Sequence, residues 1–263
     1  MGEGPVTFSV FTKPWKQMPL GELGAFVKRL GFDAIELPVR PGFQVEPEAV
    51  GRGLPAAVRT LGDHGVRIAS VAGPTDERTI AACAEAGVPV IRICVGTGGK
   101  PYMEAEAQTQ RELEALVPLL ERYGVAIGIQ NHCGDGVCSA MGIRHLIERF
   151  DPRHVAAVWD AAHSALEGEE PELGLDIVWS HLCMVNLKNA YRRRANGPEA
   201  EVARWEVYWT SGRQGFASWP RVASELKRRD WHGVVCLTAE YSEEASVERL
   251  IAEDIAFAKA LFA

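Results

Sequence analysis

The sequence has 263 residues, of which 47% are hydrophobic and 24% charged, a composition typical of globular proteins and not of disordered or fibrous chains. Its formal net charge of -7 argues against the broad basic face that nucleic-acid binding requires, so no nucleic-acid partner is expected. The apolar runs fall short of the roughly 20 residues of a membrane-spanning helix, and Met1–Pro5 carry no feature of a targeting signal, so we predict a cytoplasmic protein without membrane association.

Apolar, strand-like runs alternate with amphipathic stretches along the whole chain, a pattern typical of a parallel sheet covered by helices. Several of the intervening helices are expected to end at a glycine, namely Gly31, Gly65, Gly87, Gly124 and Gly233, because glycine readily adopts the left-handed conformation that terminates a helix. The eight predicted strands are Val6–Thr12, Asp33–Val39, Arg67–Gly73, Val90–Gly96, Ala126–His132, Val155–Asp160, Met184–Ala190 and Val234–Tyr241.

Eight such units in a chain close to the roughly 250 residues of a (β/α)8 barrel favour closure into one TIM-barrel domain of the α/β class. No phosphate-binding G-x-G-x-x-G loop follows the first strand, which argues against an open, doubly wound sheet. We therefore predict a single domain over residues 1–263.

One connection, from Tyr191 to Gly215 after the seventh strand, is unusually long. Connections of this length in compact domains are commonly lids or binding loops, and this one leaves the carboxyl end of a strand, where barrel active sites are built. Arg192, Arg193 and Arg194 within it would clamp a substrate phosphate or carboxylate. A solvated insertion, or a contact in a homo-oligomer, is the alternative.

Polar residues end the last four predicted strands, at the edge where inward side chains face a substrate. Because buried polar groups cost free energy unless they are paired, these endings predict one shared small-molecule site. The residues are Gln130 and His132 on strand five, Asp160 and His163 at the end of strand six, Asn186 and Lys188 on one side of strand seven, and Glu240 on strand eight.

These motifs resemble those of the sugar isomerase and epimerase family with the xylose-isomerase-like barrel, which includes hydroxypyruvate isomerases, ketose 3-epimerases, inosose dehydratases and endonuclease IV. The resemblance covers essentially the whole chain. It rests on Gly31–Leu37, Gln130–His132, Asp160–His163, Asn186–Asn189 and Glu240.

The resemblance implies that Gln130, Asp160, Asn186 and Glu240 hold one divalent cation, Mg²⁺ or Mn²⁺. In the family pattern, however, a glutamate stands at the position of Gln130, where it both binds the metal and transfers a proton. An amide oxygen still suits a hard cation, but it is no general base. We therefore expect the metal to be bound weakly or not at all.

The family-level expectation is an isomerase or epimerase that removes a proton alpha to the carbonyl of a small sugar, sugar acid or sugar phosphate, with Glu240 as the base. Lys188 would polarise a substrate oxygen or pair with Glu240 or Asp160. His163 is expected to be a further catalytic residue, and His132 is expected to contact the substrate. Since only one base of the usual pair remains, a single-base dehydratase or other lyase is the alternative. A sugar-binding protein that has lost catalysis is the third hypothesis.

Two further charged residues, Glu36 in strand two and Arg92 in strand four, are candidates for contact with a polyol substrate. A buried ion pair between them is the alternative.

Overall fold

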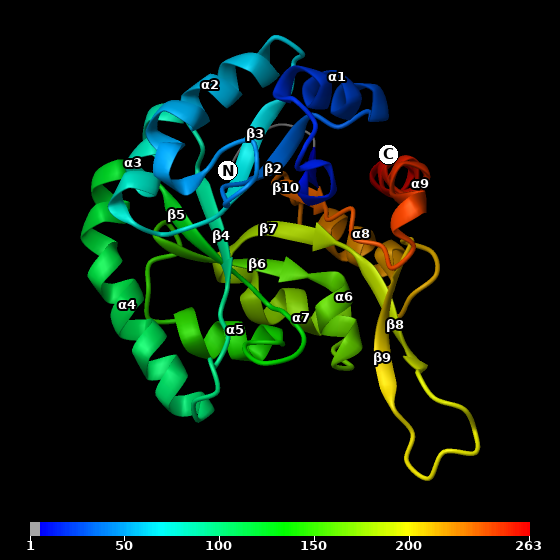
Figure 1. Cartoon of the computed structure of the whole chain (residues 1–263). Helices are drawn as coiled ribbons and strands as arrows, with labels where there is room; N and C mark the ends of the chain where they lie inside the picture. The colour runs from blue at the N-terminus through cyan, green and yellow to red at the C-terminus, as the bar shows by residue number, and fades with distance from the viewer. Residues whose placement is uncertain (1–5) are drawn as a thin grey trace.

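The computed structural model describes residues 6–263, in which eight parallel strands form a closed barrel surrounded by helices (Figure 1). Around the barrel the strands follow the order β1-β10-β7-β6-β5-β4-β3-β2, so the predicted TIM barrel is confirmed. Met1–Pro5, on which the expected absence of a targeting signal rests, lie outside the described residues. The strands are β1 Thr7–Phe11, β2 Ala34–Pro38, β3 Arg67–Ala72, β4 Val90–Cys94, β5 Ala126–Gln130, β6 Val155–Asp160, β7 Leu182–Leu187 and β10 Val234–Leu237.

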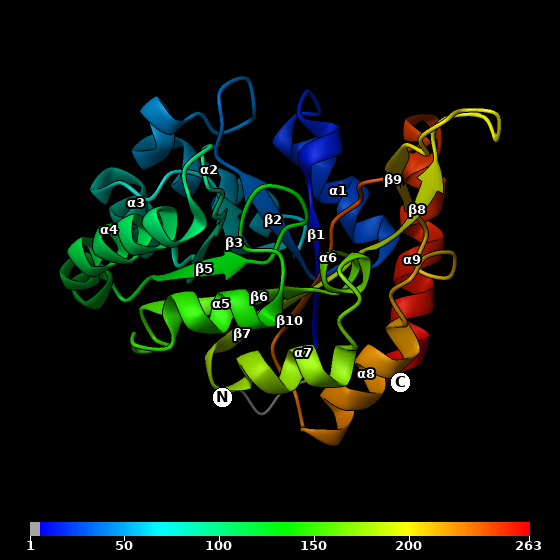
Figure 2. The ribbon, with the colours of Figure 1, turned by 90° about the horizontal axis from the view of Figure 1, so that it is seen from below.

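Helices cover the outside of the barrel, as the two orthogonal views show (Figures 1 and 2). Four of the five predicted glycine positions have positive φ, with Gly31 and Gly124 as the C-caps of α1 and α4 at 94° and 65°; Gly233 does not. The helices are α1 Leu20–Leu30, α2 Val50–Gly62, α3 Glu77–Ala86, α4 Tyr102–Tyr123, α5 Ala140–Ile147, α6 Ala161–Leu166, α7 Pro171–Val178, α8 Trp219–Arg228 and α9 Val247–Phe262, with short 3-10 turns at Lys13–Trp15, Pro47–Ala49, Trp179–His181 and Glu244–Ser246.

The barrel interior explains where the polar strand ends point. Val158 of β6 pairs in register with Met184 of β7, and both belong to one buried apolar cluster. Side chains along a strand alternate with a period of two, so Asp160 and Asn186, which also pair in register, lie on this inner face one layer nearer the carboxyl end. The site therefore begins where the apolar filling of the barrel stops.

The connection between β7 and α8 is largely an antiparallel hairpin, which the sequence analysis did not predict. Strands β8 Asn189–Arg194 and β9 Trp205–Thr210 pair along their whole length and lie apart from the barrel sheet (Figure 1). The base of the hairpin packs on α6, where Ala190 contacts an apolar cluster that also includes Trp209. The role of this segment as a lid stays a prediction.

No helix within residues 6–263 is both long enough and apolar enough to cross a membrane.

Candidate active site

A pocket lies at the carboxyl ends of the barrel strands, where the sequence places the polar endings. Gln130, His132, His163 and Glu240 line it. Lys13, just after β1, and Arg40, just after β2, line it too, although neither was predicted as a site residue. The cationic lining of the pocket therefore includes two residues that the sequence analysis did not identify.

Asp160 is held by three donors. Its Oδ1 accepts from the backbone N–H groups of Ala162 and His163, which makes it the N-cap of α6, and its Oδ2 accepts from Nε2 of Gln130 at 2.8 Å. Asn131 fixes the same turn, since its Oδ1 accepts from the Asp160 backbone N–H at 2.7 Å. Both oxygens of this carboxylate thus accept hydrogen bonds from within the protein.

Asn186 is fully buried, and neither its amide nitrogen nor its oxygen has a hydrogen-bond partner among the described residues. It lies on the inner face beside Asp160. An unpaired buried amide costs free energy, so this position suits a bound water or a polar group of a ligand.

Glu240 lies just past the end of β10 and follows Ala239, which adopts the left-handed φ of 51°. The predicted eighth strand, Val234–Tyr241, is therefore longer than the observed strand, which ends at Leu237. One carboxylate oxygen of Glu240 pairs with Lys13 at 2.6 Å, and the other pairs with Lys188. Burial alone would raise the pKa of Glu240, but the two lysines outweigh it and lower that pKa to about 2.

Lys188 is buried beneath the hairpin. Its ammonium group lies 3.6 Å from the ring centroid of Trp209 on β9, a cation–π distance, and the same ring stands edge-on to His163. Of the two carboxylates proposed as partners from the sequence, Lys188 pairs with Glu240.

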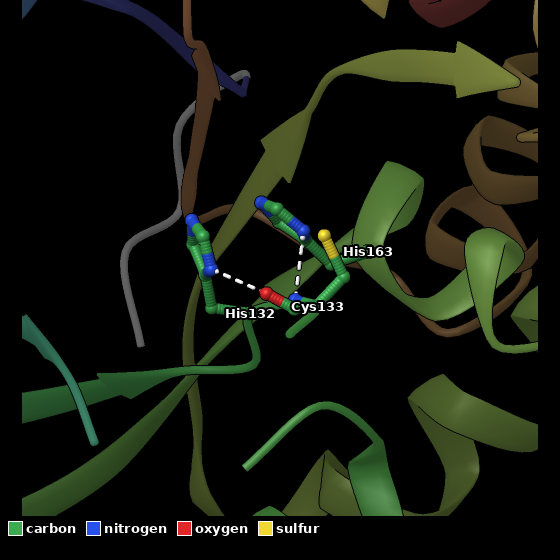
Figure 3. A group of neighbouring side chains, drawn as sticks. All are labelled: His132, Cys133 and His163. Atoms are coloured by element: carbon green, nitrogen blue, oxygen red, sulfur yellow. Dashed lines mark hydrogen bonds between the residues drawn. The ribbon is translucent and has the colours of Figure 1, made fainter. Parts of the chain in front are cut away.

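The backbone of Cys133 hydrogen-bonds to two histidines and fixes a different tautomer in each (Figure 3). A carbonyl only accepts, so His132 Nδ1, 2.9 Å from the Cys133 oxygen, must carry the proton, which leaves a lone pair on Nε2 when the ring is neutral. An N–H only donates, so His163 Nδ1, 3.0 Å from the Cys133 nitrogen, must accept, and its proton sits on Nε2. That N–H is buried without a partner among the described residues.

Burial lowers the pKa of His163 to about 4; Lys188 acts in the same direction and Asp160 opposes it. Between about pH 6.5 and pH 4 the unfolded chain therefore takes up a proton that the folded chain does not, and stability falls as the pH falls. We expect wild type to lose up to about 3 kcal/mol more than His163→Asn between pH 7 and pH 4 through this group. Urea unfolding at both pH values measures the difference, with His232→Asn as the control. Equal losses in wild type and His163→Asn would contradict the assignment.

Glu36 and Arg92 form the buried ion pair that was the alternative to substrate contact. Arg92 donates to both carboxylate oxygens of Glu36, at 2.6 and 3.1 Å, and their side chains are 8% and 0% exposed. Arg92 also lines the pocket. Its guanidinium is therefore positioned by Glu36 at the pocket wall.

The three arginines predicted as a clamp do not form a free cationic cluster. They lie on successive positions of β8, so their side chains alternate between faces. Arg192 pairs with Glu167 and Arg193 with Glu206, while Arg194 bonds to Asn196. The structure thus gives the predicted clamp no support.

The oxygen ligands expected from the family resemblance do not fit a resident divalent cation. Every oxygen of Asp160 and Glu240 already accepts from a donor, and Gln130 turns its amide nitrogen toward Asp160. Lys13 and Lys188 balance the two negative charges. Lone pairs remain on both carboxylates, but a divalent cation there would lie beside the ammonium groups of Lys13 and Lys188, and this like charge opposes its binding.

A second candidate metal site comprises His132, Cys133 and His163, which offer ligand atoms within 4.8 Å of one another. For a metal to bind there through Nδ1 of His163, that atom would have to release the Cys133 N–H. Burial also raises the pKa of the Cys133 thiol, which opposes formation of the thiolate ligand. As folded, this cluster is better suited to hydrogen bonding than to holding a metal.

Restoring the family carboxylate by Gln130→Glu should change both stability and metal binding. The new carboxylate would lie beside Asp160, so we expect a loss of about 1–3 kcal/mol without metal and at least about a tenfold gain in Mn²⁺ affinity, equivalent to about 1.4 kcal/mol. Urea unfolding in EDTA and calorimetric titration with Mn²⁺ measure both effects, with the exposed Gln214→Glu as control. Tight Mn²⁺ binding by wild type would show that our reading of the ligand set is wrong.

The closed barrel, with polar residues gathered at the carboxyl ends of its strands, defines the class of TIM-barrel proteins that have their site at that end. A family model described as xylose isomerase-like TIM barrel matches residues 25–261, and the chain belongs to that family, which includes sugar epimerases and dehydratases.

Among curated proteins, the chain is similar to inosose dehydratase from Mesomycoplasma hyopneumoniae (strain 7448), with 23% identity over 154 residues, or 54% of this chain and 50% of that protein. The matched segment thus spans about half the length of this relative. Among solved structures, D-psicose 3-epimerase from Clostridium cellulolyticum H10, determined with D-tagatose, superposes with a TM-score of 0.74 at 12% identity, covering 98% and 99% of the two chains. A probable 3-DHS dehydratase from Bacillus anthracis gives 0.73 at 14%, covering 97% and 99%. At these identities the likeness of the structures shows the fold alone.

Three residues of the site were not predicted to be functional from the sequence. Lys13 and Arg40 follow strands whose ends are otherwise apolar, and no periodic pattern marks them. Asn131 was seen only as part of a motif, yet it fixes the turn at Asp160. A search for charged residues just after every predicted strand would have found the first two.

Proposed function

We propose that this protein is a lyase that removes a proton alpha to the carbonyl of a small polyhydroxylated compound and releases a beta hydroxyl as water, without a resident metal. The observation that carries the proposal is the pair of opposite histidine tautomers fixed by Cys133. One histidine offers a lone pair and the other an N–H, and both line the same pocket.

His132 acts as the single base. Its Nε2 accepts the alpha proton as the C–H bond breaks, and the electron pair moves onto the carbonyl oxygen. As the carbonyl re-forms, a carbon–carbon double bond forms and the beta C–O bond breaks, and the imidazolium returns its proton to the departing hydroxide. The products are an unsaturated carbonyl compound and water, so atoms and charge balance.

His163 supports the enolate. Its Nε2–H is a buried donor that a substrate oxygen would satisfy, and its low pKa keeps it neutral, so it donates a hydrogen bond and not a proton. The Lys188 ammonium, held by Glu240 and Trp209, supplies positive charge close by. With two lysines on its carboxylate, Glu240 is poorly suited to the role of base expected from the sequence, and we assign it the positioning of Lys188.

Two observations favour dehydration over epimerisation. Epimerisation requires a second group to return the proton to the opposite face, and the amide of Gln130 is neither a general acid nor a general base. The curated relative that matches half of this chain is a dehydratase. Isomerisation is the second candidate, because the same base could return the proton to the neighbouring carbon.

The test is proton exchange in D₂O, followed by NMR with a panel of ketoses, inososes and hydroxylated keto acids, using protein treated with EDTA. We expect loss of the alpha-proton signal of at least one compound together with an alkene signal from its product. Exchange with formation of an isomeric sugar would favour the second candidate. No exchange across the panel, or exchange only after Mn²⁺ is added, would contradict the proposed mechanism.

A further inference from the structure

The cationic side chain of Arg40 lies at the pocket without a partner. The loop that carries it is well fixed, since the Arg40 backbone N–H donates to Val45 and its carbonyl accepts from Phe43. Among residues 6–263, however, its guanidinium makes no hydrogen bond or ion pair with another side chain; its recorded contact is with the ring of Phe11, at 5.7 Å.

The neighbouring carboxylates form their ion pairs with other cations and not with Arg40. Glu36 is bound through both oxygens by Arg92, and one of them also accepts from Ser70. Glu240 is bound by Lys13 and Lys188. Around the pocket, four cationic side chains, Lys13, Arg40, Arg92 and Lys188, thus face three carboxylates, those of Glu36, Asp160 and Glu240.

Arg40 also connects two hollows of the surface. It lines the pocket with His132 and His163, and it lines an adjoining groove whose walls include Pro41 and Pro74. A small molecule with its reacting carbon at the histidines would extend one end toward this arginine. Burial and the charge of Arg92 lower the pKa of Arg40, and Glu36 and Glu240 oppose this only in part; an anionic partner would offset the remainder.

We propose that Arg40 binds a carboxylate group of the substrate, so that the protein acts on a hydroxylated keto acid and not on a neutral sugar; this inference rests on the proposed function. A guanidinium presents two parallel N–H groups that match a carboxylate. The surplus of one positive charge at the pocket also matches a monoanion better than a phosphate dianion.

Binding of matched, unreactive probes tests the proposal without turnover. D-Gluconate and D-glucitol differ mainly in a carboxylate against a hydroxymethyl group, and glucitol 6-phosphate carries a phosphate. By calorimetric titration of wild type, we expect gluconate to bind about tenfold to a hundredfold more tightly than glucitol, the range for a hydrogen-bonded charged group. Arg40→Gln should remove this preference and Arg40→Lys should keep part of it, while Arg52→Gln, at an exposed site on α2, should leave it unchanged.

Several results would overturn the proposal: no preference for gluconate in wild type, a preference that survives Arg40→Gln, or tighter binding of glucitol 6-phosphate than of gluconate. Because the Arg40 side chain has no recorded polar partner in the fold, the melting temperature of Arg40→Gln should match that of wild type. The outcome is separable from the lyase proposal. If the preference for a carboxylate depends on Arg40 but no compound exchanges its proton, the carboxylate site is supported and the lyase reaction is rejected. If only neutral ketoses exchange, the lyase reaction is supported and the carboxylate site is rejected.

Discussion

His132→Asn is expected to reduce the rate of alpha-proton exchange by about 10²- to 10⁴-fold, the contribution of a positioned general base. Asparagine keeps a donor near the position of Nδ1, so the hydrogen bond to the Cys133 carbonyl can persist while the lone pair on Nε2 is lost. His132 is exposed, so the melting temperature should change little. Exchange measured by NMR in D₂O at saturating substrate separates this loss from a change in binding.

The matched control is His232→Asn, which alters an exposed histidine that pairs with Asp230 and should leave exchange unchanged. A His132→Asn protein with more than a tenth of the wild-type rate would rule out His132 as the base.

The second large effect is expected at the buried ion pair. Arg92→Met should destabilise the fold by about 3–5 kcal/mol, because it leaves the Glu36 carboxylate buried without a cation. Adding Glu36→Gln to this variant should recover a substantial part of the loss, since a neutral amide is far less costly to bury than an unpaired charge. Urea unfolding of the two single variants and the double variant completes the cycle.

Arg111→Met, at an exposed position on α4, controls for the change of an arginine to methionine and should alter stability by less than about 0.5 kcal/mol. A double variant no more stable than Arg92→Met alone would mean that the loss comes from packing and not from the unpaired carboxylate. The cycle also bears on function, because Arg92 stands at the pocket wall beside Arg40.

The sequence by itself determined the barrel and the approximate composition of its mouth. Eight apolar runs with short connections have few other ways to bury their surfaces, and the period of two within each strand places Gln130, Asp160 and Asn186 on inward positions. These are local properties, set by the order of residues along each strand. They remain readable without knowledge of any contact between strands.

The partners of the charged groups were decided only by the tertiary structure. Lys13 and Glu240 are 227 positions apart in the chain, and Glu36 and Arg92 are 56 positions apart. No local sequence pattern therefore predicts either ion pair. Likewise, the tautomers of His132 and His163 depend on the backbone of one turn, and the two strands of the hairpin became recognisable only by pairing with each other. Charge and proton positions depend on distances across the closed barrel, because electrostatic and hydrogen-bond energies fall steeply with separation.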